Sequence, residues 1–434
     1  MLKIIHSICC GVDIHKKFIY ATLVCTTDTG RASYTTQKFS TFNDDLSRFK
    51  QWLIDNNCFE VCMESTGKYW IPVYNILEDK INITLANPKY IKAIKGKKTD
   101  KKDSIWIADL HRHGLVPGSY IPPHDIRQLR DICRYRTKLV SNRSSEKNRV
   151  QNSLTMCNLA ISHVLSDTFG KTAQRIIEYV TTCDAFDVEH CKTLIDGRVK
   201  ADHDEVIRSI VGYQLSLEQV LKIRFANEHL SFLENSLNNI DEQITMLATP
   251  FNSQIELLAT IPGITTVSAT RIISEIGVDM TVFHSAKHLC SWAGLVPQNN
   301  ESAGKKKSVK ISRAGVYLKP LLVQCANAAI KNKKDTYFAI KYQQIKKRRG
   351  HKKAIIAIAR MILNCAYHMI LKNEPFEPID SIPKDTSSEL IQAKNEPLNI
   401  QCPDIQAALN LLKHNGFDVS QLNLLTTQQP NDCS

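Results

Sequence analysis

The order of apolar patterns in the first 90 residues limits the fold of this chain more than any other feature. Three β-branched and aromatic runs come first, and helical and strand-like runs then alternate. The predicted strands are residues 8–14, 18–25, 32–40, 59–64 and 81–86, and the predicted helices are residues 42–56 and 69–78. The first three strands form a meander and each later strand follows a helix, which predicts a layered α/β domain.

These patterns divide the chain into four parts. Residues 1–124 hold the α/β domain, whose element order is that of a ribonuclease-H-like fold. Residues 125–250 are helical, and their second apolar stripe needs a partner helix, either within the chain or in an antiparallel coiled coil across a dimer. Residues 251–372 are compact and all-α. Residues 373–434 form an acidic, partly disordered tail, to which we assign no chemistry.

The net charge is distributed unevenly along the chain. Its 434 residues carry a formal charge of +13, and a hydrophobic content of 43% excludes a mostly disordered or multi-span membrane protein. Residues 301–360 contain 17 Lys and Arg against two acids, whereas residues 373–434 contain nine acids against three lysines. A lysine run is usually solvated surface, but a patterned helical segment with so one-sided a charge predicts binding to the phosphates of a nucleic acid.

The cysteines and the longest apolar run are both expected in the core. The 14 cysteines form no paired Cys-x-x-Cys units, so we interpret them as small reduced core residues rather than metal ligands. Arg360, Asn364 and His368 interrupt the apolar run of residues 354–371, which favours a helix against the core over a membrane span. No secretory leader is recognisable in the first residues, so we expect a cytoplasmic protein that does not enter a membrane.

Four acids could carry chemistry. Asp13 follows an apolar strand and Glu64 ends another, and an acid at such a position is costly unless something pairs with it. Asp100 and Asp103 are three residues apart at the start of a helix, so they project from one face. Carboxylate-rich sites suit Mg²⁺, and two such ions can hold the attacking and leaving oxygens of a phosphodiester. The alternative makes Asp13 a turn residue, Glu64 a strand end and Asp100 a helix cap.

Basic residues surround the second pair of acids. Seven lysines lie between residues 89 and 102, and they repel one another unless a polyanion such as a nucleic acid backbone is present. Those expected to bind nucleic acid are Lys97, Lys98, Lys101 and Lys102. Further along, Gly263 follows Pro262 between two apolar helical runs, as in a helix-hairpin-helix, where the amides of the second helix bind a phosphate. The alternative there is an ordinary helix-to-helix turn.

A serine lies in a small, basic loop of the third part. The loop is residues 301–307, and Ser302 would be exposed beside cations that stabilise charge developing at a phosphorus atom. The basic residues expected to contact nucleic acid here are Lys305, Lys306, Lys307, Lys310 and Arg313. A loop serine is nearly always inert, and no nearby His or Asp completes a protease-like triad. The loop alone therefore does not make Ser302 a nucleophile.

In combination these motifs resemble those of the DEDD transposases, insertion-sequence recombinases that include the Piv-type DNA invertases. The matching segments of the amino-terminal domain are Gly11-Val-Asp13, Met63-Glu-Ser-Thr-Gly67, Asn87-Pro88 and Lys98-Thr-Asp-Lys-Lys-Asp-Ser104. Those of the carboxy-terminal transposase domain are Ile261-Pro-Gly-Ile264, Phe283, Ala293-Gly-Leu-Val-Pro297, Glu301-Ser-Ala-Gly304, Ile311-Ser-Arg-Ala-Gly315 and His351-Lys-Lys-Ala354. The resemblance covers residues 8–371 and keeps all four acids in order.

The resemblance implies a RuvC-like first domain in which the four acids hold Mg²⁺. It implies that Ser302 is the nucleophile that takes a DNA strand as a phosphoserine ester, with Ser308 and Ser312 as substitutes. It also implies a structured noncoding guide RNA, encoded by the element, whose base pairing selects the DNA sites while the basic residues hold the backbones.

On this resemblance we expect a transposase that excises and inserts its own element, acting at the nucleoid on donor and target DNA as a homodimer or homotetramer. A site-specific DNA invertase of the same family is the nearest alternative. A nucleic-acid-binding regulator without activity is disfavoured because the four acids and Ser302 are intact. A junction nuclease that hydrolyses with water would need the acids but not Ser302.

Overall fold

The computed structural model of the chain describes residues 3–27, 29–65, 67–91, 99–297, 300–302, 305–308, 310–332 and 337–378. Every helix and strand named below belongs to one unit of the chain, residues 1–376. Lys97, Lys98 and nearly all of the predicted acidic tail lie outside the described residues.

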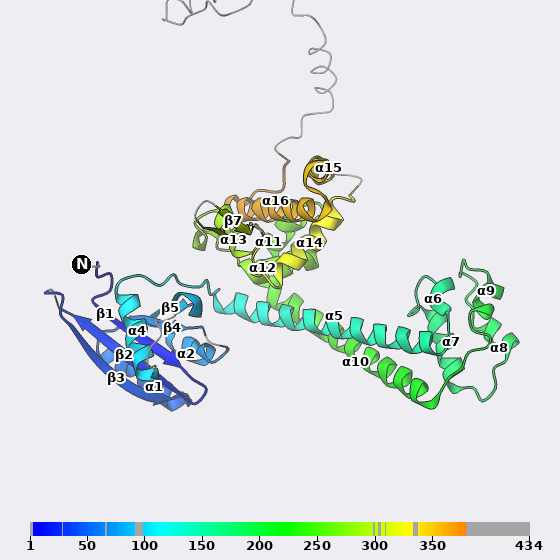
Figure 1. The fold of residues 1–434 in the computed structure, drawn as a ribbon, viewed down its shortest axis with the longest axis horizontal. Coiled ribbons are helices and arrows are strands. Elements are labelled where there is room, and N and C mark those ends of the chain that lie inside the picture. The colour runs from blue at the N-terminus through cyan, green and yellow to red at the C-terminus, as the bar shows by residue number, and fades with distance from the viewer. Residues whose placement is uncertain are drawn as a thin grey trace, which may run out of the picture. The chain divides into compact units, whose positions relative to one another are not determined.

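A five-stranded mixed sheet forms the centre of the amino-terminal domain (Figure 1). Its strands, in spatial order, are β3 (Ala32–Ser40), β2 (Phe18–Thr26), β1 (Ile8–Ile14), β4 (Glu60–Glu64) and β5 (Asn82–Ala86). The first three strands of the chain pair antiparallel, and β4 and β5 extend the sheet in parallel from β1. β1 is central and largely buried on both faces, which explains why its sequence is apolar without alternation. The predicted α/β arrangement, including the meander, is confirmed.

Helices cover both faces of this sheet. α1 (Asn43–Asp55) and α2 (Trp70–Leu77) pack on one face, where Phe49 of α1 is fully buried in a cluster with Val12 of β1. The short α3 (Pro88–Ile91) leads toward α4 (Asp100–Arg112), which packs on the other face and buries Ile107 with Cys62 of β4.

α4 approaches β1 more closely than a side chain at Gly11 would permit. A Cβ atom at Gly11 would lie 2.2 Å from the amide nitrogen of Ala108 and 2.4 Å from the carbonyl oxygen of Ser104. Beside this contact, the hydroxyl groups of Thr22 and Ser104 share a buried hydrogen bond of 2.7 Å. Gly11 therefore allows the helix to lie directly on the strand, and the hydroxyl pair fixes its position.

Two long helices form an antiparallel pair in the middle of the chain (Figure 1). Leu139 of α5 (His124–Met156) is buried in one cluster with Leu233 and Leu237 of α10 (Leu217–Ala248). The apolar stripe predicted for the second helix thus packs within the chain. The segment between these helices forms a smaller core from α6 (Ile161–Val164), α7 (Lys171–Thr182), α8 (Val188–Thr193) and α9 (His203–Arg208).

The elements after α10 share one core with the first turns of α5. They are the helices η1 (Thr249–Phe251), α11 (Asn252–Ala259), α12 (Thr266–Ile276), η2 (Met280–Val282), α13 (Ala286–Trp292), α14 (Leu318–Ala329), α15 (Tyr337–Arg349) and α16 (His351–Lys372). Two short strands, β6 (Asn300–Ser302) and β7 (Lys305–Ser308), lie between α13 and α14 in the chain. Among the described residues α16 is long and apolar enough to cross a membrane, but Ile358, Ile362 and Leu363 are buried in this core. Core packing therefore accounts for its hydrophobicity.

The cysteines follow the sequence-based interpretation. In the described part of the chain all twelve are free, and nine of them are buried. Burial raises the pKa of Cys62 to about 12, so this thiol stays protonated and unreactive. These residues act as small apolar side chains.

Candidate functional site

Two of the four acids lie near the carboxyl ends of neighbouring parallel strands, Asp13 one residue before the end of β1 and Glu64 at the end of β4. β1 and β4 pair in register with Val12 opposite Met63, and the next residue in each strand is an acid, Asp13 or Glu64. Asp13 is therefore a strand residue and not a turn residue. Because the strands run parallel, both acids lie at the same edge of the sheet.

Both acids project toward α4. In β1, Gly11 contacts the backbone of α4, and in β4, Cys62 lies in a buried cluster with Ile107 of α4. Asp13 and Glu64 each stand two residues further along their strands, and side chains alternate across a sheet, so the acids face the same side. The side chain of Asp13 is only 14% exposed, and Glu64 is half-buried.

α4 brings the other two acids to this edge. Its N-cap is Thr99, whose side-chain oxygen accepts a hydrogen bond from an amide of the first turn. Asp100 is therefore not the cap, and it stands with Asp103 in that first turn. The structure thus gathers the four predicted acids at one end of the sheet, on the side that α4 covers.

A histidine that the sequence patterns did not single out lies among these acids. The Nε2 atom of His15 is 3.2 Å from Oδ2 of Asp13 and 3.5 Å from Oδ1 of Asp100. These three atoms all lie within 4.8 Å of one another. The signal in the sequence was the spacing Asp-Ile-His, since residues two apart in an extended segment project to the same side.

The environment of Asp13 disfavours its charged form. Burial raises the pKa of its carboxyl group, the neighbouring His15 lowers that pKa, and the charges of Asp103 and Asp100 raise it, so the net direction is upward. Asp103 therefore acts on Asp13 electrostatically, and the three carboxylates form one cluster. A divalent cation would compensate both the burial and the repulsion, and oxygen-rich donor sets are those that hard cations prefer. The residues present fit a divalent metal.

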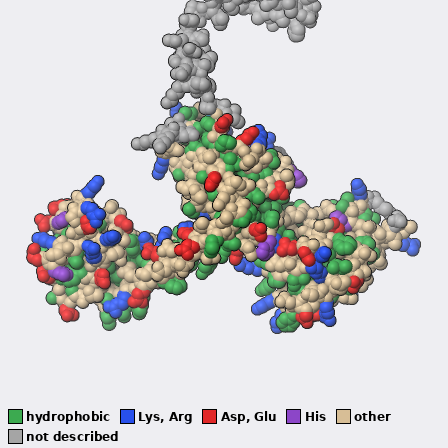
Figure 2. Space-filling view, turned by 180° about the vertical axis from the view of Figure 1, so that it is seen from behind, with side chains coloured by type: hydrophobic (Ala, Val, Ile, Leu, Met, Phe, Trp, Pro, Cys, Tyr) green, Lys and Arg blue, Asp and Glu red, His purple; other side chains and the backbone are tan. Residues whose placement is uncertain are grey.

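The lysines near the cluster are only partly described. Lys101 and Lys102 are exposed in the first turn of α4. Lys89, in α3, lies over the ring of Tyr90 at 5.9 Å. On the face in Figure 2, Lys and Arg side chains are dispersed over the described surface and mixed with Asp and Glu.

Backbone packing explains why residue 263 is a glycine. It lies between α11 and α12 with a φ angle of +88°, and a Cβ atom there would lie 2.5 Å from the amide nitrogen of Ala329 in α14. The side chain of Thr265 caps α12 by accepting a hydrogen bond from the amide of Ser268. A turn between two helices agrees with the sequence pattern, while its use in phosphate binding stays a prediction.

Ser302 lies in a hairpin, and the predicted loop over residues 301–307 is wrong. β6 and β7 pair antiparallel with Ser302 opposite Lys305. These strands have three and four residues and carry no apolar alternation, so the sequence offers no strand pattern there. Lys305, Lys306 and Lys307 all belong to β7.

The base of this hairpin is tightly held. An isolated antiparallel bridge joins Pro297 to Ile311. A Cβ atom at Gly315, where φ is +67°, would lie 2.2 Å from the carbonyl oxygen of Ala293. The ammonium group of Lys319 donates hydrogen bonds of 2.7 and 2.9 Å to two carbonyl oxygens of the same loop. These contacts hold residues 311–315, which follow the hairpin in the chain, against residues 293–297, which precede it.

Three other residues predicted to act near the hairpin lie just after it in the chain. Lys310 and Arg313 are both exposed. The hydroxyl of Ser312 accepts a hydrogen bond of 3.2 Å from the amide of Ala314. Ser312 therefore stabilises a local turn.

Comparison with known proteins identifies the family. Residues 10–158 match a transposase family, the DEDD transposases of the IS110 type. Residues 255–343 match the transposase IS116/IS110/IS902 family. The chain is 32% identical over 164 residues to the pilin gene-inverting protein of Moraxella bovis, an alignment that covers 35% of this chain and 49% of that protein. It is 23% identical over 326 residues to the transposase for insertion sequence element IS1111A of Coxiella burnetii, covering 73% of this chain and 79% of that protein.

The two matches together establish that the chain belongs to the IS110-type transposase family. The chain spans about half the length of the pilin gene-inverting relatives it matches. The first match contains all four acids and the second contains Ser302.

Proposed function

We propose that this protein is a DNA recombinase that excises and inserts its own insertion element by strand exchange. The observation that carries the proposal is the convergence of Asp13, Glu64, Asp100 and Asp103 at one edge of the sheet. Family membership supports it, because relatives are named as a transposase and as pilin gene-inverting proteins.

The acids would act together on a phosphodiester. Asp13, Glu64, Asp100 and Asp103 would hold Mg²⁺, which supplies positive charge to the phosphate when it is bound. His15 holds the carboxylate of Asp13 through a contact of 3.2 Å, and Gly11 keeps α4 close enough for its acids to reach that carboxylate. The sheet order β3-β2-β1-β4-β5 and the helices on both faces support a RuvC-like fold for this domain.

Ser302 would be the nucleophile of strand exchange. Its Oγ attacks the phosphorus atom and forms a phosphoserine ester, the bond from phosphorus to one deoxyribose oxygen breaks, and the serine proton passes to that leaving oxygen. One phosphate ester replaces another, so rejoining needs no ATP. The fixed hairpin base supports this assignment, and the turn role of Ser312 favours Ser302 over Ser312.

Two basic regions would hold nucleic acid backbones. One is the lysine-rich approach to α4, which includes Lys101 and Lys102, and the other is the hairpin with Lys310 and Arg313. In this proposal an element-encoded guide RNA pairs with the DNA, the helix-hairpin-helix at Gly263 binds a phosphate, and two or four copies of the chain act together at the nucleoid. The division at residues 124, 250 and 372 is part of the same proposal.

A second candidate is a site-specific DNA invertase. The 32% identity to a pilin gene-inverting protein favours it over an inactive nucleic-acid-binding regulator and over a junction nuclease. The DNA on either side of the gene separates the transposase from the invertase, because an insertion element has defined ends and an invertase acts on a fixed segment.

The test of the proposal is element excision in cells. A plasmid carries the element, and the resealed junction is quantified for the wild type, Asp13→Asn and Glu64→Gln. We expect both substitutions to abolish excision. The control is Asp109→Asn, which removes a charge from the same helix as Asp100 but outside the cluster. Excision at the wild-type level by a variant that carries both Asp13→Asn and Glu64→Gln would contradict the proposal.

A further inference from the structure

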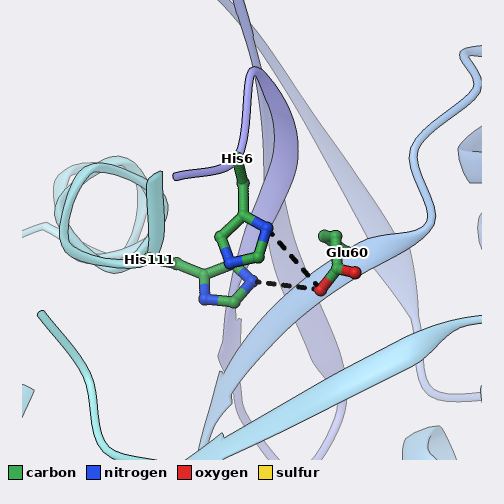
Figure 3. Close-up of side chains that lie close together, drawn as sticks. All are labelled: His6, Glu60 and His111. Carbon is green, nitrogen blue, oxygen red and sulfur yellow. Dashed lines mark ion pairs between the residues drawn. The ribbon is translucent and has the colours of Figure 1, made fainter. Parts of the chain in front are cut away.

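A second cluster of potential metal ligands lies in the amino-terminal domain, away from the four acids (Figure 3). His6 precedes β1, Glu60 is the first residue of β4, and His111 stands in the last turn of α4. Glu60 and Glu64 are at opposite ends of β4, and at about 3.3 Å per residue they are about 13 Å apart. The cluster is thus a separate site on the same sheet.

The three side chains converge on one oxygen atom. Nδ1 of His6 lies 3.9 Å and Nε2 of His111 lies 4.0 Å from Oε2 of Glu60, and all three ligand atoms lie within 4.8 Å of one another. These distances are too long for hydrogen bonds. Zinc binds imidazole and carboxylate at about 2.0–2.2 Å, so a shift of less than about 1 Å would bring the three atoms onto one ion.

The buried histidine lacks a partner. The side chain of His111 is 3% exposed, and its Nε2 atom has no hydrogen-bond partner within the described residues. If Nε2 carries the proton, a buried donor is unsatisfied; if it carries a lone pair, that pair faces the lone pairs of Glu60. Burial lowers the pKa of His111 to about 4, so the ring is neutral near pH 7. A cation between Nε2 and Oε2 would resolve either arrangement.

The surrounding contacts orient these ligands. The amide of Asn82 donates a hydrogen bond of 3.0 Å to Oε1 of Glu60, which leaves Oε2 directed at the histidines. The backbone amide of His6 donates a bond of 3.1 Å to the carbonyl oxygen of Arg112, so the segment before β1 is tied to the end of α4. The rings of His6 and His111 stack at 4.6 Å. Hydrogen bonds of this kind around a metal ligand fix its position.

We propose that His6, Glu60 and His111 bind one Zn²⁺ ion. Two imidazoles and a carboxylate are ligands that zinc accepts, and a water molecule completes the tetrahedron. The side chains of His6 and Glu60 are 26% and 30% exposed, so one side of the site is open to that water. The ion links the segment before β1, the start of β4 and the end of α4, and it stabilises the helix whose first turn carries Asp100 and Asp103.

Metal content of the full chain tests this inference without reference to recombination. The protein is purified with excess Mg²⁺, dialysed against trace Zn²⁺ and analysed by elemental mass spectrometry. We expect about one Zn²⁺ per chain, absent from the double variant with His6→Ala and Glu60→Gln. Co²⁺ in place of Zn²⁺ should give the visible spectrum of a tetrahedral site in the wild type only.

Two further variants keep the result interpretable. Asn82→Ala changes an exposed residue that does not contact the ion, and we expect zinc affinity to fall about tenfold. The matched control is His284→Ala with His288→Ala, an exposed histidine pair whose rings are 5.3 Å apart, and it should keep the ion. The inference fails if the wild type binds no zinc, if the His6 and Glu60 variant keeps it, or if Asp13→Asn removes it instead.

Discussion

Replacement of Gly11 by alanine tests how the sheet and α4 position the acids. The new Cβ atom would lie 2.2 Å from the amide nitrogen of Ala108, whereas non-bonded atoms of this kind pack at more than 3 Å. The two nearest atoms, the amide nitrogen of Ala108 and the carbonyl oxygen of Ser104, belong to the backbone of α4, so the clash cannot be relieved by rotating a side chain. α4 must recede by about 1 Å, and overpacking of this kind destabilises a fold by about 1–3 kcal/mol.

The displaced helix carries Asp100 and Asp103 away from Asp13. A misplacement of about 1 Å in a catalytic site can lower a rate about 100-fold. We therefore expect Gly11→Ala to lower excision of the element by about this factor, together with a lower melting temperature. Excision is measured well below that temperature, so that loss of folded protein does not explain the result.

The control and the refuting outcome are both defined by the structure. Gly118→Ala places a Cβ atom at an ordinary 3.6 Å from a methyl group of Thr84, so it should leave stability and excision unchanged. If Gly11→Ala is destabilised yet excises the element at the wild-type rate, then the close approach of α4 does not align the acids. If it is neither destabilised nor less active, the packing argument itself is wrong.

Two other predictions concern stability, and a third concerns the reactivity of the thiols. Hydrogen bonds from Arg149 and His229 lower the pKa of Glu146 in the α5–α10 pair. The ionised carboxylate of Glu146 therefore stabilises the fold above its unfolded pKa of about 4.5, and this stabilisation is lost as the pH falls. Glu146→Gln should make the free energy of urea unfolding less dependent on pH in this range. Gly263→Ala should lower the free energy of unfolding by about 2 kcal/mol or more in the same assay, because φ is +88° and the new Cβ atom would lie 2.5 Å from backbone atoms of α14. Buried thiols such as Cys62 should react slowly with a thiol reagent at pH 8 in the folded protein, and all 14 cysteines should react in denaturant.

The sequence predicted those elements whose pattern reflects burial. The strands of the first sheet and the α5–α10 stripe are apolar because they face a core, and that pattern is local. The α10 stripe did not indicate which helix it would meet, since a partner in the same chain and one in a second chain bury the same residues. The β6–β7 hairpin was missed because its strands have only three and four residues and show no apolar alternation.

The acid cluster was also predictable in part, because some of its members lie in local sequence patterns. Asp13 and Glu64 were recognisable as acids next to buried strand residues, and Asp100 and Asp103 by their spacing on a helix. His15 was not singled out, because its contact with Asp100 joins residues from separate elements. The pairing of His6 and His111 depends on how α4 ends against the sheet, and no local spacing encodes it.

The most direct test of strand exchange through Ser302 is the covalent link itself. Protein, guide RNA and a nicked donor DNA are incubated with Mg²⁺, and the protein–DNA adduct is digested and mapped by mass spectrometry. The proposal predicts a nucleotide on the peptide that contains Ser302, and no adduct with Ser302→Ala or Asp13→Asn. An adduct that persists in Ser302→Ala, or cleavage by the wild type with no adduct at all, would contradict it.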